Sequence, residues 1–255
     1  MKTKELLWLH RYEEAISACR ERLSQNPDDF GAVELLMKAF RAKGHFAEAL
    51  SWLERLEAHH REDKIAKIMT PGSAAWQIDI ACLIWLLGDR PKATALMHAL
   101  AAGILDGSIR YGDVAGGMEQ GLLLYYMGVT SRLRDETSFA LTYLSGRVER
   151  LRKLVTLPWP CPIAQFLLGE ISIDRVLEEV NRQPRLAKVD AETLELGRRK
   201  RLVLALFYDG IKSRAEGKEA CCLNRMRECQ EMEDPFLVQE WYLARGEIQR
   251  FAGDF

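Results

Sequence analysis

A short motif occurs twice near the start of the chain, and this duplication constrains the fold more than any other feature. The segment 10–17, HRYEEAIS, matches the segment 44–51, GHFAEALS, with the aromatic, the second glutamate and the alanine aligned. Each matched pair is separated by 34 residues, as Tyr12 and Phe46 show (46 − 12). Self-similarity at a fixed period of this size is typical of helical repeat proteins. The chain is therefore predicted to consist of stacked helical hairpins.

The residues of the two copies fit that prediction physically. Ala15 and Ala49 stand where two helices approach closely, so a small side chain is needed there. Apolar residues follow each alanine at helical spacing. Pro27 cannot continue a helix, and Gly44 can end one in the left-handed conformation that glycine adopts easily. A plain helical hairpin with a coincidental match is the alternative interpretation.

The 34-residue, two-helix unit resembles the tetratricopeptide repeat. The first unit also closes with Asn26-Pro27-Asp28-Asp29, which is similar to the turn that this family uses between repeats. The resemblance implies a helical solenoid with a protein-binding surface, without naming the partner. The C-terminal half, through its Trp159-Pro160 and Phe207-Tyr208 segments, is similar to NlpI-like bacterial tetratricopeptide lipoproteins. The chain lacks their lipoprotein leader, which argues against an envelope role.

Composition narrows the class of protein. The 255 residues are 48% hydrophobic and 29% charged, which is enough to bury a large core, and the net charge of −1 gives no general indication of nucleic-acid binding. The sequence shows no signal-peptide core and no apolar run near the roughly 18 residues of a membrane span. We therefore expect a cytoplasmic protein that binds neither nucleic acid nor membrane. A leader removed before the first residue is the alternative.

The cysteines and histidines do not indicate a metal site. None of the six cysteines forms a Cys-x-x-Cys pair, and the five histidines offer no helical ligand pair with a carboxylate. Cys222 and Cys229 are seven residues apart on one helix face, about 10 Å along the axis, which exceeds the disulfide limit of roughly 7 Å. We expect free thiols that act as small core residues, and no cofactor.

Glycines and prolines divide the rest of the chain into helices. Turn glycines are expected at positions 44, 88, 128 and 217, with Asp190 as the N-cap of a long helix that reaches residue 216. These signals predict an all-α solenoid of five or six tetratricopeptide-like hairpins, closed by a capping helix over 236–251. We expect a single domain over 1–255, with regular repeats in 1–100 and longer, divergent ones in 101–255.

The segment 103–117 interrupts the helical pattern with five glycines. Its polar residues Asp106, Arg110, Tyr111 and Asp113 form the first candidate binding site, because loops placed by a rigid scaffold often carry function. A phosphate-cradling loop is the alternative, although the Gly-Lys-Ser/Thr ending is missing. Asp106 and Asp113 are the nearest approach to an acid–base pair, and two loop aspartates are usually only solvated.

The resemblance implies a second candidate site on the concave face, lined by the first helix of each hairpin. Glu34, Lys38 and Arg41 are charged residues on one helix face and are expected to be exposed. Further groove positions are occupied by Trp85, Leu122, Tyr125, Phe207 and Arg214. Aromatic and arginine side chains dominate interface energies. For Trp85, Leu122 and Phe207 a place in the core is the favoured interpretation.

The function expected from these features is binding rather than catalysis. The sequence contains no nucleophile motif and no paired catalytic carboxylates. Short repeat proteins without a leader resemble immunity proteins, which bind and neutralise one cognate toxin. The alternative is an adaptor or chaperone that gathers several clients more weakly. A third class, a small-molecule or enzymatic protein, requires a deep pocket with carboxylates of perturbed pKa.

Overall fold

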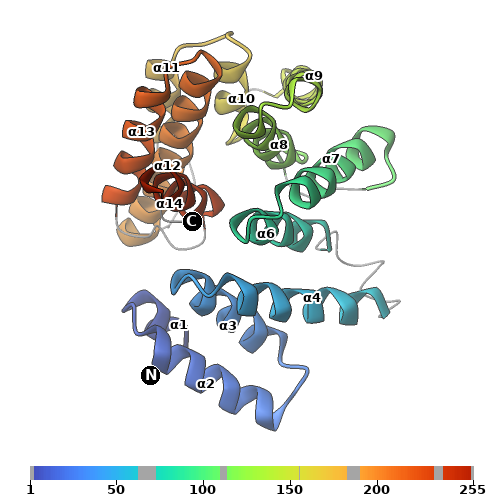
Figure 1. Ribbon diagram of the computed structural model, residues 1–255, viewed down its shortest axis with the longest axis vertical. Helices are drawn as coiled ribbons and strands as arrows, with labels where there is room; N and C mark the ends of the chain where they lie inside the picture. Colours follow the sequence, from blue (N-terminus) through green and yellow to red (C-terminus); the bar gives the residue numbers. More distant parts are fainter. Residues whose placement is uncertain are drawn as a thin grey trace. The chain divides into compact units, whose positions relative to one another are not determined.

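The computed structural model describes residues 3–62, 73–109, 114–154, 156–182, 190–232 and 238–253. These residues form helices and no strand, so the chain is all-α as its periodicity predicts (Figure 1). The helices are α1 (Thr3–Trp8), α2 (Tyr12–Gln25), α3 (Phe30–Ala42), α4 (Phe46–Glu62), α6 (Ser73–Leu86), α7 (Arg90–Asp106), α8 (Met118–Ser131), α9 (Arg134–Leu151), α10 (Cys161–Leu167), α11 (Ile173–Asn181), α12 (Ala191–Ala215), α13 (Glu219–Glu231) and α14 (Gln239–Ala252).

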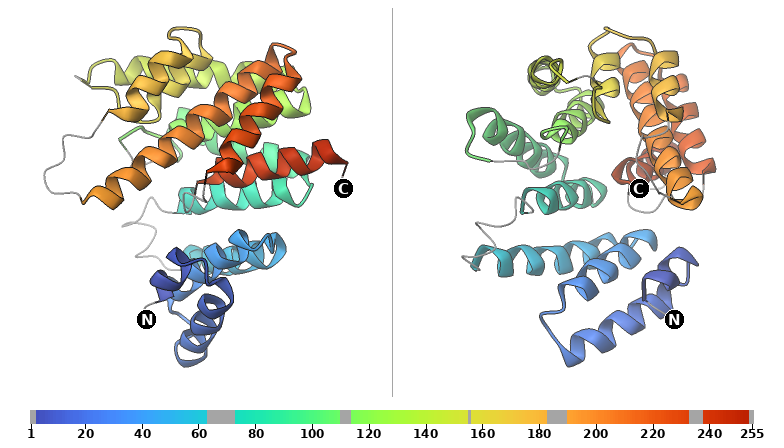
Figure 2. Two further views of the ribbon diagram at one scale, coloured as in Figure 1. Left: turned by 90° about the vertical axis from the view of Figure 1, so that its left-hand side faces the viewer. Right: turned by 180° about the vertical axis from the view of Figure 1, so that it is seen from behind.

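The chain divides into two compact units, Met1–Leu96 and Met97–Phe255. In unit 1, α2, α3, α4 and α6 each pack on the next helix of this series, and α1 packs on both α2 and α3. In unit 2, α8 pairs with α9, and α12 pairs with α13 (Figure 2). The last helix, α14, lies against both α12 and α13. A single solenoid domain over 1–255 stays a prediction.

Six helix pairs are joined by one kind of turn. At the end of the first helix a residue adopts the left-handed conformation, and the N–H of the next residue donates to the carbonyl five positions back, as His45 does to Phe40. The left-handed positions, in chain order, are His10, Gly44, Gly88, Arg132, Gly169 and Gly217. The expectation of five or six hairpins is therefore confirmed, and so are three of the four turn glycines.

The prediction of a turn glycine at position 128 is wrong. Helix α8 continues past Gly128 to Ser131, and Arg132 takes the left-handed position with φ 59°. Gly128 instead lets α8 approach α9, since a Cβ there would lie 2.9 Å from the backbone nitrogen of Thr137. A side chain in the left-handed conformation costs about 1–2 kcal/mol compared with glycine. Arg132 therefore destabilises this turn relative to the glycine that occupies the same position in four other turns of the chain.

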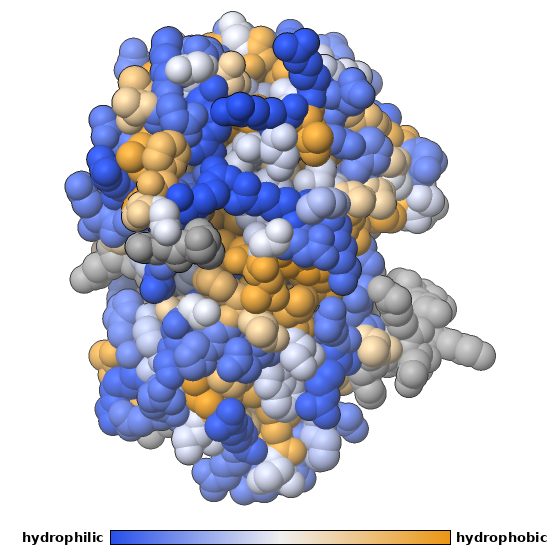
Figure 3. Space-filling model, in the orientation of Figure 1, coloured by the Kyte–Doolittle hydropathy of each residue, from blue (hydrophilic) through white to orange (hydrophobic). Residues whose placement is uncertain are grey.

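The core follows the repeat pattern. Ala15 and Ala49, the two close-contact alanines of the duplicated motif, are completely buried, and so is Ala93 in the third hairpin. Helix α6 is buried on nearly every side from Ile78 to Trp85, as its apolar sequence predicts. All six cysteines are free thiols. Five are buried, as expected of small core residues, whereas Cys221 is exposed, so that expectation is wrong for Cys221. Hydrophilic side chains dominate the face drawn in Figure 3, with smaller apolar areas between them.

Candidate functional site

A pocket of about 1090 Å³ lies in unit 2, where two interhelix turns and the end of a third segment meet. Its walls are the α8–α9 turn with the first turn of α9, the α12–α13 turn, and the last turn of α14. Four arginines line it, together with one carboxylate, Glu219. We call it the arginine pocket after Arg132, Arg134, Arg214 and Arg250. The rest of the lining consists of three hydroxyl side chains, three apolar side chains and two glycines: Thr130, Thr137, Ser138, Val129, Ala215, Phe251, Gly128 and Gly217.

Arg214 lies at the base of this pocket within a buried ionic network. Its side chain is 8% exposed, and Nη1 lies 2.7 Å from the Glu247 carboxylate, which is 2% exposed. Arg214 also donates to Glu219 at 2.8 Å and to Thr130 at 3.2 Å. Tyr126 donates its hydroxyl to Glu247 at 2.8 Å. The network therefore joins α8, α12, α13 and α14 beneath the pocket.

The electrostatics of this network favour the charged form of Arg214 and the neutral form of Tyr126. Burial alone would lower the pKa of the Arg214 guanidinium, but the Glu247 carboxylate and the Glu219 hydrogen bond raise it overall. Burial and the neighbouring Glu247 charge raise the pKa of the Tyr126 hydroxyl well above its usual value. Arg214 is thus a permanent cation and Tyr126 a permanent donor. Together they hold α12 and α14 in the geometry that forms the pocket.

The rim of the pocket differs from its base. Arg132 and Arg134 are exposed, and neither side chain forms a hydrogen bond or ion pair with any described residue. Arg132 occupies the left-handed position after α8, and Arg134 is the first residue of α9. The close approach at Gly128 fixes the two helices that carry them. The pocket thus presents two guanidinium groups that the described protein residues leave available.

Donors of this kind bind anions. Guanidinium groups pair with carboxylates or phosphates through two parallel hydrogen bonds, and hydroxyls add single ones. The described lining residues include no histidine, cysteine or lysine. Across the described part of the chain, no group of three or more His, Cys, Asp or Glu side chains could hold a metal ion.

No known family model matches this chain, and no curated protein gives a significant match. The tetratricopeptide resemblance therefore stays a prediction from the repeat motif. In the part of the chain that the structure describes, no helix has both the length and the apolar character that crossing a bilayer requires. The arginine pocket has to be interpreted from its own geometry.

The three charged residues expected to be exposed on the concave face differ in their exposure. Glu34 is exposed and forms an ion pair with Lys38, whose side chain is only 16% exposed. Arg41 is buried at 1% exposure and lies 2.9 Å from the Asp79 carboxylate of α6, so the expectation that it is exposed is wrong. Arg41 joins α3 to α6 within unit 1. A charged residue can be buried when a partner compensates it, and Asp79 lies too far along the chain for helical spacing to reveal.

The aromatic groove residues lie in the core. Trp85 and Tyr125 are each 4% exposed, and Leu122 and Phe207 are completely buried. The core interpretation of Trp85, Leu122 and Phe207 is therefore confirmed. Burial raises the pKa of the Tyr125 hydroxyl to about 12, with a further contribution from the Glu216 charge. Tyr125 is inaccessible to a partner in this structure.

The glycine-rich segment is only partly described. Arg110, Tyr111 and Asp113 lie outside the described residues. Helix α7 runs through Gly103 to Asp106, so the irregular segment starts later than 103. Asp106 is exposed, and its carboxylate accepts from the backbone N–H of Ser108 at 2.8 Å. Hydrogen bonds from the Ser108 side chain and backbone lower the pKa of Asp106, as expected for a turn-capping carboxylate.

Of the candidate binding residues named from sequence, only Arg214 lines the arginine pocket. Sequence analysis missed Arg132, Arg134 and Arg250. The segment that carries Arg132 and Arg134 is separated by more than 80 residues from the α12–α13 turn and from Arg250, so no local pattern connects them. One local signal was present. With the turn placed correctly, Arg132 stands where glycine is expected, and such a departure marks a residue kept for a reason other than folding.

Proposed function

We propose that this protein is a non-enzymatic helical-repeat protein that binds one specific protein partner, in the manner of an immunity protein that neutralises a toxin. The observation that carries the proposal is the arginine pocket in unit 2. Arginines with an aromatic beside them are the residue types that dominate protein interfaces. The cation–π contact of Arg214 with Phe251, 6.0 Å from the guanidinium carbon to the ring centroid, places both types in one pocket.

Binding fits the chemistry of the pocket better than catalysis. Its lining carboxylate, Glu219, accepts hydrogen bonds from Arg214 and is engaged in that ion pair. The rim presents two guanidinium groups, which can only donate, with hydroxyls beside them. A pocket whose excess charge is positive favours one complementary partner over a set of varied clients.

The proposal is tested with the whole protein as bait in an extract of its native host. We expect one dominant partner, identified by mass spectrometry, that binds the purified protein with nanomolar affinity or tighter in a calorimetric titration. The charge-reversed variant Arg132→Glu/Arg134→Glu should bind it at least about tenfold more weakly. Many partners that bind weakly and survive the charge reversal would instead establish the adaptor alternative.

A further inference from the structure

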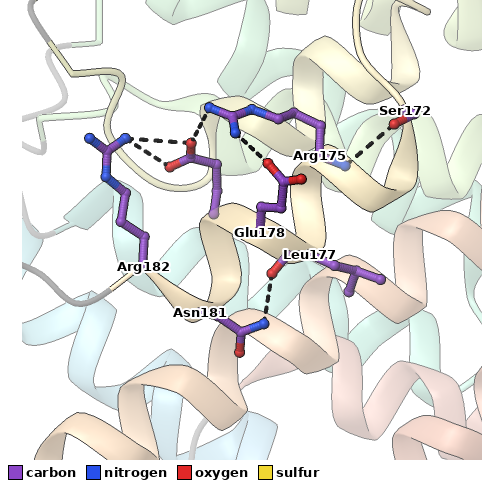
Figure 4. Close-up of polar contacts among 7 residues, drawn as sticks. Ser172, Arg175, Leu177, Glu178, Asn181 and Arg182 are labelled. Carbon is purple, nitrogen blue, oxygen red and sulfur yellow. Dashed lines mark hydrogen bonds and ion pairs between the residues drawn. The ribbon is translucent and has the colours of Figure 1, made fainter.

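The two rim arginines differ from the arginines that pair with a carboxylate of their own helix one turn away. Figure 4 shows such a pair in α11, where Arg175 reaches Glu178. Arg175 also lies 2.9 Å from the Glu179 carboxylate, and Arg182 lies 3.3 Å from it. Arg132 and Arg134 have no such partner among the described residues. Their charge is left for another molecule.

Each rim arginine also occupies a position that folding disfavours. Arg132 holds a left-handed backbone conformation that glycine adopts in four of the six equivalent turns. His10, the other exception, shares a hydrogen bond between its ring Nδ1 and the Tyr12 hydroxyl at 2.7 Å, whereas the Arg132 side chain has none among the described residues. Arg134 is the first residue of α9, at the positive end of the helix dipole. Two neighbouring residues that oppose local stability on one pocket rim indicate a binding role.

The surroundings of the rim select the kind of anion. Glu219 lines the pocket and Glu247 lies beneath it, so four arginines face two carboxylates and the excess positive charge is moderate. A ligand with several phosphate groups would be repelled by these two carboxylates as well as attracted by the arginines. Phe251 is 45% exposed in the wall and offers an apolar contact surface. The pocket, at about 1090 Å³, exceeds the roughly 300–1,000 Å³ of small-molecule sites.

From these observations we propose that the arginine pocket takes an acidic segment of the partner protein, with two of its carboxylates on Arg132 and Arg134 and an apolar side chain against Phe251. Each carboxylate accepts two parallel hydrogen bonds from one guanidinium. The Ser138 hydroxyl, on the α9 face that lines the pocket, donates to a backbone carbonyl of the segment. The Thr137 hydroxyl already donates to the Leu133 carbonyl at 2.9 Å and accepts from a backbone N–H of the segment. This inference rests on the proposed function and identifies the chemistry of the partner.

The probe is a fluorescein-labelled ten-residue peptide of aspartate, glutamate, phenylalanine and leucine, followed by fluorescence anisotropy at low salt. We expect Arg132→Gly to weaken its binding about tenfold or more while leaving the thermal midpoint of the protein unchanged or higher. Arg134→Ala should behave in the same way. Arg150→Ala, at another exposed arginine of α9 without a partner among the described residues, should bind as the wild type does.

Three outcomes would overturn the inference. The first is equal binding of the peptide by the wild type and the two rim variants. The second is equal binding of a control peptide in which asparagine and glutamine replace the acidic residues. The third is a labelled oligonucleotide or inorganic phosphate that displaces the peptide and binds more tightly. If the protein partner binds the rim variants as it binds the wild type, this inference is wrong and the proposed one-partner function is unaffected. If no single partner is found, the proposed function itself is wrong.

Discussion

Arg214→Ala is expected to lower the free energy of unfolding by about 3–5 kcal/mol, the usual effect of removing one member of a buried ion pair. The Arg214 side chain is 8% exposed and Glu247 is 2% exposed, so water cannot replace the lost partner. Glu247 would keep Tyr126 and Arg250 but would lose its buried cation. Hydrogen bonds from Arg214 to Glu219 and Thr130 would be lost as well.

Urea denaturation followed by circular dichroism measures this effect. The matched control is Arg150→Ala, which removes an exposed arginine and should change stability by less than about 0.5 kcal/mol. If Arg214→Ala unfolds at the same urea concentration as the control, the ionic network beneath the pocket does not hold α12 and α14 together.

Glu240→Gln is expected to stabilise the protein at pH 8 by about 3 kcal/mol. Glu240 is 2% exposed in α14 and accepts the Tyr208 hydroxyl at 3.1 Å. Burial raises the pKa of its carboxyl group to about 7 from the usual 4.5, although hydrogen bonds from its backbone and from Tyr208 act in the opposite direction. A glutamine is neutral, has the same shape and can still accept the Tyr208 hydrogen bond.

The sign of the pH dependence follows from the raised pKa. Between pH 4.5 and about 7 the folded state keeps a proton on Glu240 that the unfolded state releases, so this residue's contribution to stability falls as pH rises through that window. The stability difference between Glu240→Gln and the wild type should therefore grow from pH 4.5 to pH 7 and then level off. Urea midpoints of both proteins across this range measure it. A difference that is constant with pH would show that Glu240 does not titrate near 7.

The repeat motif allowed the hairpin architecture to be predicted, because its determinants are local. A left-handed residue, a close-contact alanine and an apolar helix face all act within one or two turns, so Gly44, Ala15 and Ala49 could be interpreted from the sequence alone. The Asp190 N-cap is a further case, since its carboxylate accepts from the Thr193 backbone N–H at 2.8 Å as its position predicts.

The residues that were misplaced depend on contacts far apart in the chain. Arg41 is buried because Asp79, 38 residues later, compensates its charge. Gly128 resembles a turn glycine in spacing, but its neighbour across the helix pair, Thr137, requires a residue without a side chain. The arginine pocket combines the α8–α9 turn with the α12–α13 turn and the end of α14. Periodicity within one hairpin carries no information on which hairpin ends meet.

Hydrogen exchange of the protein, measured with and without its partner, tests the location of the binding site most directly. We expect the partner to slow amide exchange in the three segments that wall the arginine pocket, 128–138, 214–219 and 250–251, because these segments become covered on binding. The Arg132→Gly/Arg134→Ala variant should show little of this protection at the same partner concentration. Protection confined to other segments, with these three exchanging as fast as in the free protein, would contradict the assignment of the pocket as the binding site.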